Sequence, residues 1–70
     1  MHASESTLDL HLKQAGYNLT EPRRKVFKEL QDYGPLSMQD LYTRLTSVNR
    51  TTVYRVIELF EELNIAQRVA

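Results

Sequence analysis

The stretch that decides the fold is NRTTVYRVIELFEEL, residues 49–63. Its apolar residues recur at spacings of three, one, three and three, which places them on one face of a helix. They are Val53, Val56, Ile57, Phe60 and Leu63. Asn49 precedes the run, and its side chain can cap the free amides at a helix start. The stretch predicts an amphipathic helix whose outward side chains include Thr51, Tyr54, Arg55 and Glu58.

A second strong helix signal lies between Thr20 and Gly34. The Thr20 hydroxyl can cap free amides, Glu21 suits the positive end of a helix, and Pro22 is tolerated in the first turn. Gly34 and the proline after it end the segment, so the helix is predicted to run to about Tyr33. The face expected to be core comprises Val26, Phe27, Leu30 and Tyr33.

Two shorter helices are predicted on either side of this one. Residues 37–40 read Ser-Met-Gln-Asp, the pattern of a capping box, and predict a third helix of about two turns. Near the amino terminus, Ser6 can cap a helix that ends at Gly16. Its leucines alternate as in a strand, but no β-branched residue occurs between Leu8 and Gly16, which favours helix. Asn64 can adopt a left-handed cap, with residues 65–69 extended beyond it.

Length and composition bound the class of protein. Seventy residues, 41% hydrophobic and 26% charged, make one compact domain over residues 1–70. Cysteine is absent, and no apolar run approaches the roughly 20 residues that span a bilayer, so we expect a cytoplasmic protein without membrane contact. Nine basic and nine acidic side chains give a formal net charge of zero, so composition alone is neutral on nucleic-acid binding.

No catalytic or metal-binding arrangement is visible in the sequence. There is no glycine-rich phosphate loop, no H-E-x-x-H motif and no plausible serine, histidine and carboxylate set. Glu61 and Glu62 are adjacent on a helix and therefore point apart. The only histidines are His2 and His11, which do not make a credible zinc site. We expect neither an enzyme nor a cofactor held by this chain.

The order of the predicted helices matches a helix-turn-helix. A short third helix, a turn of about four residues and a longer fourth helix with a polar first half are typical of a motif whose second helix enters the major groove of DNA. Outward Arg, Thr and Glu side chains are usually only a solvated surface. An exposed Tyr54 beside Arg55, following two threonines, favours binding.

Basic residues also cluster at the start of the second helix, where they could clamp phosphates. They are Arg23, Arg24, Lys25 and Lys28. Glu58, Glu61 and Glu62 would repel DNA and are expected on the half of the fourth helix directed away from a duplex. The alternative hypothesis is a protein-interaction module that binds no DNA, with Tyr54 and Leu59 as its anchors.

Three segments together resemble the ferric uptake regulator family. They are residues 19–23 (LTEPR), residues 36–42 (LSMQDLY) and above all residues 52–63 (TVYRVIELFEEL). The order and spacing match from about Leu12 to Val69. The resemblance implies a mainly α-helical, four-helix winged helix-turn-helix domain, with the wing truncated because the chain stops within its first strand at Val69-Ala70. It also implies that the dimerisation and metal-sensing domain is absent.

The function implied by this resemblance is sequence-specific binding of an A/T-rich operator by the amino-terminal domain of a metal-responsive bacterial repressor. Tyr54 would meet thymines, Arg55 a base edge or phosphate, and Thr52 and Arg23 the backbone. The candidate DNA-binding residues are Arg23, Arg50, Thr51, Thr52, Tyr54 and Arg55. The parent protein is expected to be a homodimer that binds zinc, iron or manganese through the missing domain, with this fragment a monomer. Departures from the family pattern occur at Asn18, Arg50-Thr51 and Asn64.

Overall fold

The computed structural model describes residues 5–67, in which there are four helices and no strand. The helices are α1 (Glu5–Gln14), α2 (Glu21–Tyr33), α3 (Met38–Arg44) and α4 (Arg50–Glu62). All four predicted helices and the all-α class are therefore confirmed. Residues 65–67 form no strand, and Val69 and Ala70 lie outside the described residues. The truncated wing stays a prediction.

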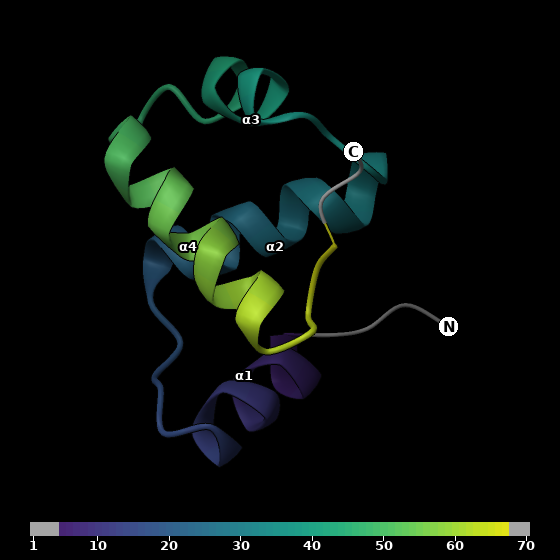
Figure 1. Ribbon diagram of the computed structural model, residues 1–70, viewed down its shortest axis with the longest axis vertical. Helices are drawn as coiled ribbons and strands as arrows, with labels where there is room; N and C mark the ends of the chain where they lie inside the picture. Colours follow the sequence, from purple (N-terminus) through teal and green to yellow (C-terminus); the bar gives the residue numbers. More distant parts are fainter. Residues whose placement is uncertain (1–4, 68–70) are drawn as a thin grey trace.

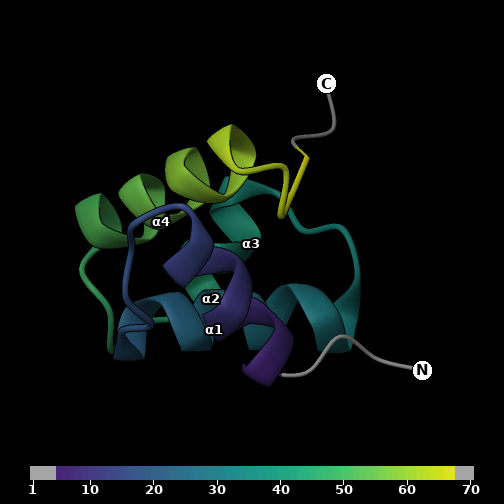
Figure 2. The same cartoon turned by 90° about the horizontal axis from the view of Figure 1, so that it is seen from below.

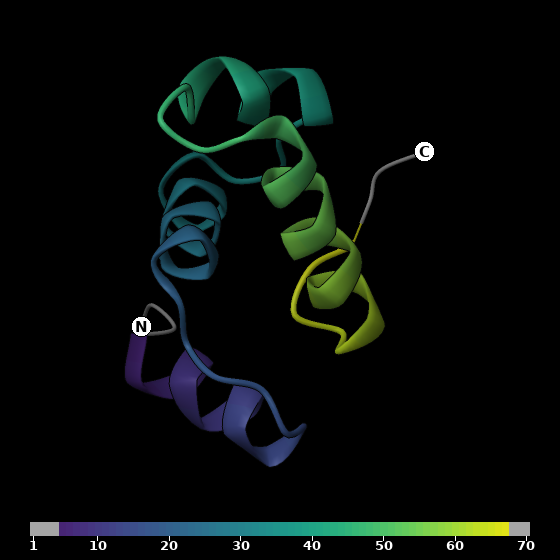
Figure 3. The ribbon, with the colours of Figure 1, turned by 90° about the vertical axis from the view of Figure 1, so that its left-hand side faces the viewer.

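The helices form a small bundle around the crossing of α2 and α4. Helix α4 packs against both α2 and α3, while α3 lies at the top of the bundle and α1 at the bottom (Figure 1). Seen from below, α1 lies across the space between α2 and α4 (Figure 2). Seen from the left-hand side, α2 and α4 stand opposite one another (Figure 3). The first half of α4 therefore faces the same region as the start of α2.

The helix starts follow the predicted capping chemistry. The Thr20 hydroxyl accepts a hydrogen bond from the Arg23 amide at 3.4 Å. At α3, Asp40 and Ser37 form the reciprocal capping box, with the Asp40 amide donating to Ser37 Oγ at 3.0 Å. These side chains satisfy amides that the first turn of a helix leaves without a partner. Ser6 lies inside α1, which is described from Glu5, so its predicted role as the N-cap is wrong.

Two helices end in the same hydrogen-bonded motif. After α1 the Tyr17 amide donates to the Leu12 carbonyl at 2.8 Å and the Gly16 amide to the Lys13 carbonyl at 3.0 Å, while Gly16 has φ of 87°. After α4 the equivalent bonds surround Asn64, whose φ is 59°. This arrangement is the Schellman motif, and it confirms the predicted left-handed cap at Asn64.

The core comprises buried side chains from all four helices and from Leu45 just beyond α3, which is why so short a chain can exclude water from a common centre. They are Leu8, Leu12, Val26, Leu41, Leu45, Val53, Val56, Ile57, Leu59 and Phe60. Leu8 and Leu12 are buried whereas Leu10 is 59% exposed, a spacing of four that belongs to a helix. In the described part of the chain, no helix is long and apolar enough to cross a membrane.

Two expectations about the core are wrong. The spacing in α2 predicts Tyr33 on the core face, yet it is 58% exposed, and its ring lies under the Arg44 guanidinium at 3.5 Å from the ring centroid. It occupies the last turn of α2, where the Arg44 side chain of α3 covers it instead of the core. Leu59, expected as an exposed anchor, is only 8% exposed because it belongs to the core cluster.

Candidate nucleic-acid interface

The first half of α4 presents polar side chains to solvent, as the sequence predicts. Thr51 and Arg55 are exposed, and they share one side of the helix because four residues separate them. Tyr54 is 41% exposed. The Asn49 side chain accepts a hydrogen bond from the Thr51 amide at 2.8 Å and so fixes the start of the helix. This surface is therefore presented by a helix whose start is capped.

A depression of about 310 Å³ lies between α4 and the segment that leads into α2. We call it the α2–α4 depression, and it is lined by Tyr17, Thr20, Pro22, Arg23, Thr52, Arg55, Val56 and Leu59. Three of the candidate residues from the sequence, Arg23, Thr52 and Arg55, meet here. Two guanidinium groups and hydroxyl groups beside an open hollow offer hydrogen-bond donors to an anion.

Two residues of the α1–α2 connection, Tyr17 and Asn18, contact the Arg23 side chain. Its Nη1 donates to the Asn18 carbonyl at 2.6 Å, and its Cζ lies 5.5 Å from the centroid of the Tyr17 ring. A guanidinium has five N–H donors, and this bond uses only one of them. Within residues 5–67 Arg23 has no acidic partner. The remaining donors are available to a ligand in the α2–α4 depression.

The opposite edge of the α4 surface carries Arg50. Its guanidinium carbon lies 5.3 Å from the centroid of the Tyr42 ring of α3, a cation–π contact. Tyr54 follows Arg50 by four residues and so lies on the same side of α4. The candidate residues thus form two groups, Arg23, Thr52 and Arg55 at the α2–α4 depression and Arg50 and Tyr54 toward α3, with Thr51 beside Arg55 on the exposed face.

Ion pairing divides the basic side chains into two classes. Four of them are neutralised by acidic side chains, in the pairs Lys13–Asp9, Arg24–Glu21, Lys28–Asp32 and Arg44–Glu29. Among the described residues the basic side chains without such a pair are Arg23, Lys25, Arg50 and Arg55. Three of these four are candidate residues from the sequence. Within residues 5–67, the positive charge without an acidic partner therefore lies on α4 and at the start of α2.

Two pKa shifts belong to the neutralised pairs. The hydrogen bond from Arg24 lowers the pKa of Glu21 below 4.5 against an opposing effect of desolvation, and the charges of Arg24 and Lys25 lower it further. The hydrogen bond to Glu29 raises the pKa of Arg44, opposed by desolvation. Both shifts favour the charged forms. Both pairs therefore stay ionised near neutral pH, so the charges of Arg24 and Arg44 are compensated by their acidic partners.

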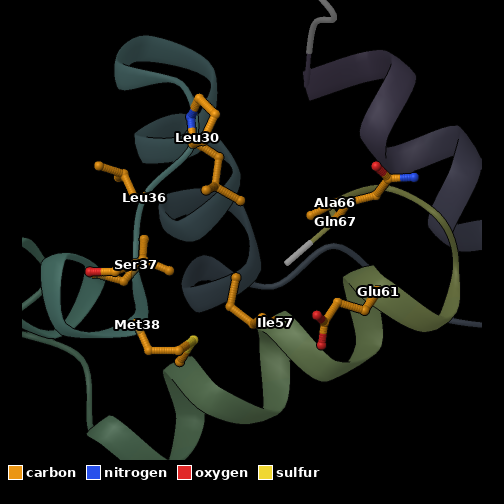
Figure 4. A pocket seen from close by; sticks show the side chains of 10 residues that line it. Leu30, Leu36, Ser37, Met38, Ile57, Glu61, Ala66 and Gln67 are labelled. Carbon is orange, nitrogen blue, oxygen red and sulfur yellow. The ribbon is translucent and has the colours of Figure 1, made fainter. Parts of the chain in front are cut away.

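A second concave surface, the apolar groove, lies away from these residues. Its volume is about 480 Å³, and side chains from α2, the α2–α3 connection, α3, α4 and the segment after α4 surround it (Figure 4). Glu61 is the only titratable side chain in its lining. Nothing in this groove resembles the groups of interacting acids and bases that carry catalysis.

The residues that could bind a metal are scattered. No group of three or more His, Cys, Asp or Glu side chains lies together within the part of the chain that the structure describes. His11 is exposed on α1, and His2 lies outside the described residues. The described side chains therefore supply no donor set for a metal ion.

Sequence reasoning missed one side chain of this surface, Tyr17, and gave a second, Lys25, no role of its own. Tyr17 lines the α2–α4 depression and stacks with Arg23, and the signal for its fixed position was Gly16, whose predicted cap fixes the residue that follows it. Lys25 enters the sequence prediction only as part of a charge cluster. Its Nζ lies 3.5 Å from Ser47 Oγ in the turn before α4, which links the start of α2 to the helix-turn-helix.

The comparisons with known proteins identify relatives of this chain. The ferric uptake regulation protein of Escherichia coli (strain K12) is 40% identical over 63 residues, covering 81% of this chain and 43% of that protein. The protein of the same name from Klebsiella pneumoniae is 40% identical over 63 residues, covering 81% of this chain and 41% of that protein. The one from Vibrio vulnificus (strain CMCP6) is 38% identical over 63 residues, covering 81% of this chain and 42% of that protein. The chain spans about two fifths of the length of these relatives.

No solved structure matches the chain significantly. The family model described as the ferric uptake regulator family matches residues 14–70. That match covers α2, α3, α4 and the connection from α1 that contains Tyr17. Because it spans most of the sequence and the relatives agree with it, this chain belongs to the ferric uptake regulator family.

Proposed function

We propose that residues 1–70 are the amino-terminal, DNA-binding domain of a longer metal-responsive bacterial repressor, and that α4 reads an A/T-rich operator. The observation that carries the proposal is the gathering of unpaired cations at one surface, with Arg23 and Arg55 beside the same depression. The relatives support it, since their names describe ferric uptake regulation. Their greater length supports the view that further domains complete the parent protein.

The proposed contacts follow from the placement of the side chains. An α-helix fits the major groove of B-DNA, so the exposed first half of α4 would lie against base edges. Arg55 can then reach a guanine edge or a phosphate, and Tyr54 a thymine methyl group. Arg23 and Thr52, at the α2–α4 depression, would hold the sugar–phosphate backbone, and Arg50 and Thr51 would contact it at the helix start.

The metal response, to zinc, iron or manganese, is assigned to parts of the parent protein other than these residues. The described residues offer no group of three or more His, Cys, Asp or Glu side chains that could hold a metal ion. The proposed homodimer would double the number of contacts by binding two half-sites. A single domain binds one half-site, so we expect its affinity to be weak and strongly dependent on salt.

Fluorescence anisotropy with a labelled A/T-rich duplex tests the proposal. Arg55→Ala is expected to weaken binding by about 1–3 kcal/mol if Arg55 contacts a guanine edge. Lys28→Ala is the matched control, because it removes the same charge from a residue already paired with Asp32. If both variants weaken binding equally, only net charge matters and α4 is not the reading element. If the wild-type chain binds no duplex at low salt, the proposal is wrong.

The role of Tyr54 is tested on the DNA instead of the protein. Replacing thymine by uracil removes only the methyl group that an apolar side chain contacts in the major groove. Wild-type affinity is expected to fall on the uracil duplex, whereas Tyr54→Ala should bind the two duplexes equally. An equal effect of uracil on the wild type and on Tyr54→Ala would remove Tyr54 from the thymine-reading residues.

A further inference from the structure

We propose that Tyr17 is a positioning residue, which holds the Arg23 guanidinium at the α2–α4 depression so that its free N–H groups meet a DNA phosphate. This inference rests on the proposed DNA binding and extends it to a residue outside the helix-turn-helix. It starts from the observation that Arg23 and Arg55 line the same hollow without an acidic partner among residues 5–67.

Two like charges beside one hollow repel each other, which favours orientations of Arg23 that point away from Arg55. Two contacts oppose this tendency. The Asn18 carbonyl accepts a hydrogen bond from Nη1 at 2.6 Å, and the face of the Tyr17 ring attracts the cation at 5.5 Å. Both contacts lie on the side of the α1–α2 connection, which leaves the rest of the guanidinium for a ligand.

The Tyr17 ring can serve as a fixed support because its backbone is itself restrained. The Tyr17 amide donates to the Leu12 carbonyl in the Schellman motif that ends α1, and Gly16 supplies the positive φ that the motif requires. The ring is half-buried and packs against the core cluster. Helix α1 thereby fixes the orientation of a side chain on α2.

The chain contains an internal control of the same chemistry. Tyr33 also stacks with an arginine, Arg44, at 3.5 Å, but Arg44 is neutralised by Glu29 and neither residue lines the α2–α4 depression. If a tyrosine–arginine stack mattered only for stability, replacing either tyrosine would leave the DNA affinity of the folded chain unchanged. The proposal predicts that only Tyr17 affects it.

The experiment compares Tyr17→Leu, Tyr17→Phe and Tyr33→Leu by anisotropy with the A/T-rich duplex, with circular dichroism to confirm folding. Tyr17→Leu is expected to weaken binding about two- to fivefold, the scale of an exposed cation–π contact. Tyr17→Phe keeps the ring and should bind as the wild type does, and Tyr33→Leu should be silent. In the Arg23→Ala background, Tyr17→Leu should cause no further loss. Loss of affinity that persists in that background would overturn the proposal.

A measurement without DNA separates this inference from the proposed function. In the NMR spectrum of the free chain, the ring current of Tyr17 should shift the Arg23 Hδ and Hε resonances upfield. The shift should persist in Tyr17→Phe and vanish in Tyr17→Leu. If the stack is present but no variant changes DNA affinity while Arg55→Ala does, the proposed function stands and the positioning role is wrong. If the shift is absent from the wild type, the positioning role is also wrong.

Discussion

Arg23 of α2 and Arg55 of α4 lie beside one depression, brought there by the crossing of the two helices. Neither has an acidic partner in the described part of the chain, so their charges act together on whatever approaches. Electrostatic free energy stored between two unpaired like charges is released when an anion binds between them. We therefore expect the domain to have a local affinity for phosphate that its net charge of zero does not suggest.

A double-mutant cycle tests whether the two arginines act as a unit. Arg23→Ala and Arg55→Ala should each weaken binding to DNA, and the double variant should lose less than the sum by about 0.5 kcal/mol or more, because residues that share a ligand couple. Arg23→Ala with Arg50→Ala is the control pair, since Arg50 lies at the other edge of α4 against Tyr42. Strict additivity for Arg23 and Arg55 would mean that they bind separate phosphates.

The two glycines should respond differently to asparagine. Gly34 has φ of 75° and ψ of −153°, a region that essentially only glycine enters, so Gly34→Asn should cost about 1–3 kcal/mol of unfolding free energy. Gly16 has φ of 87° at a helix end, where asparagine is tolerated, and Gly16→Asn should cost less. Neither glycine has an atom within 4 Å of an added Cβ, so backbone strain is the cause. Equal shifts in urea midpoint would contradict this ranking.

Local chemistry explains how much of the fold was predictable. The caps at Thr20, Ser37 and Asn49 involve atoms within a few residues, so residue type alone indicates them, and the structure confirms all three. The core position of Leu59 was missed because a helical wheel gives the direction of a side chain but not the width of the covered arc. Leu59 lines the α2–α4 depression together with Tyr17. Tyr17 lies in the α1–α2 connection, so a helical wheel drawn for α4 does not show this contact.

In the candidate site, too, features set by one helix were predictable, and features set by the packing of two segments were not. The outward direction of Arg55 and Thr51 follows from the period of one helix and was predicted. The approach of Arg23 to Arg55 depends on how α2 crosses α4, and the stack of Arg23 on Tyr17 depends on the course of the α1–α2 connection. Tertiary relationships of this kind have no single-segment signal, so the sequence indicates which side chains point outward but not how they group.

The Glu21–Arg24 pair predicts a measurable acid titration. Because Arg24 lowers the folded-state pKa of Glu21 below 4.5, the pair stabilises the fold above that pH, and the contribution is lost as the pH falls through the lowered pKa. A carbon-detected NMR titration should place the Glu21 midpoint below 4.5 in the wild type and closer to 4.5 in Arg24→Ala. Lys28→Ala, which belongs to another pair, should leave the midpoint in place. A midpoint that does not respond to Arg24→Ala would rule out this cause.

Truncating Leu59 distinguishes a core residue from a partner anchor. Because Leu59 is only 8% exposed within the core cluster, Leu59→Ala should lower the unfolding free energy by about 2–5 kcal/mol, through lost burial and the cavity left behind. Leu10→Ala is the matched control: it removes the same atoms from a side chain that is 59% exposed and should change stability by about 0.5 kcal/mol or less. Urea denaturation measures both. If Leu59→Ala is as mild as Leu10→Ala, Leu59 is free to bind a partner, and the protein-interaction hypothesis regains the anchor that burial removes.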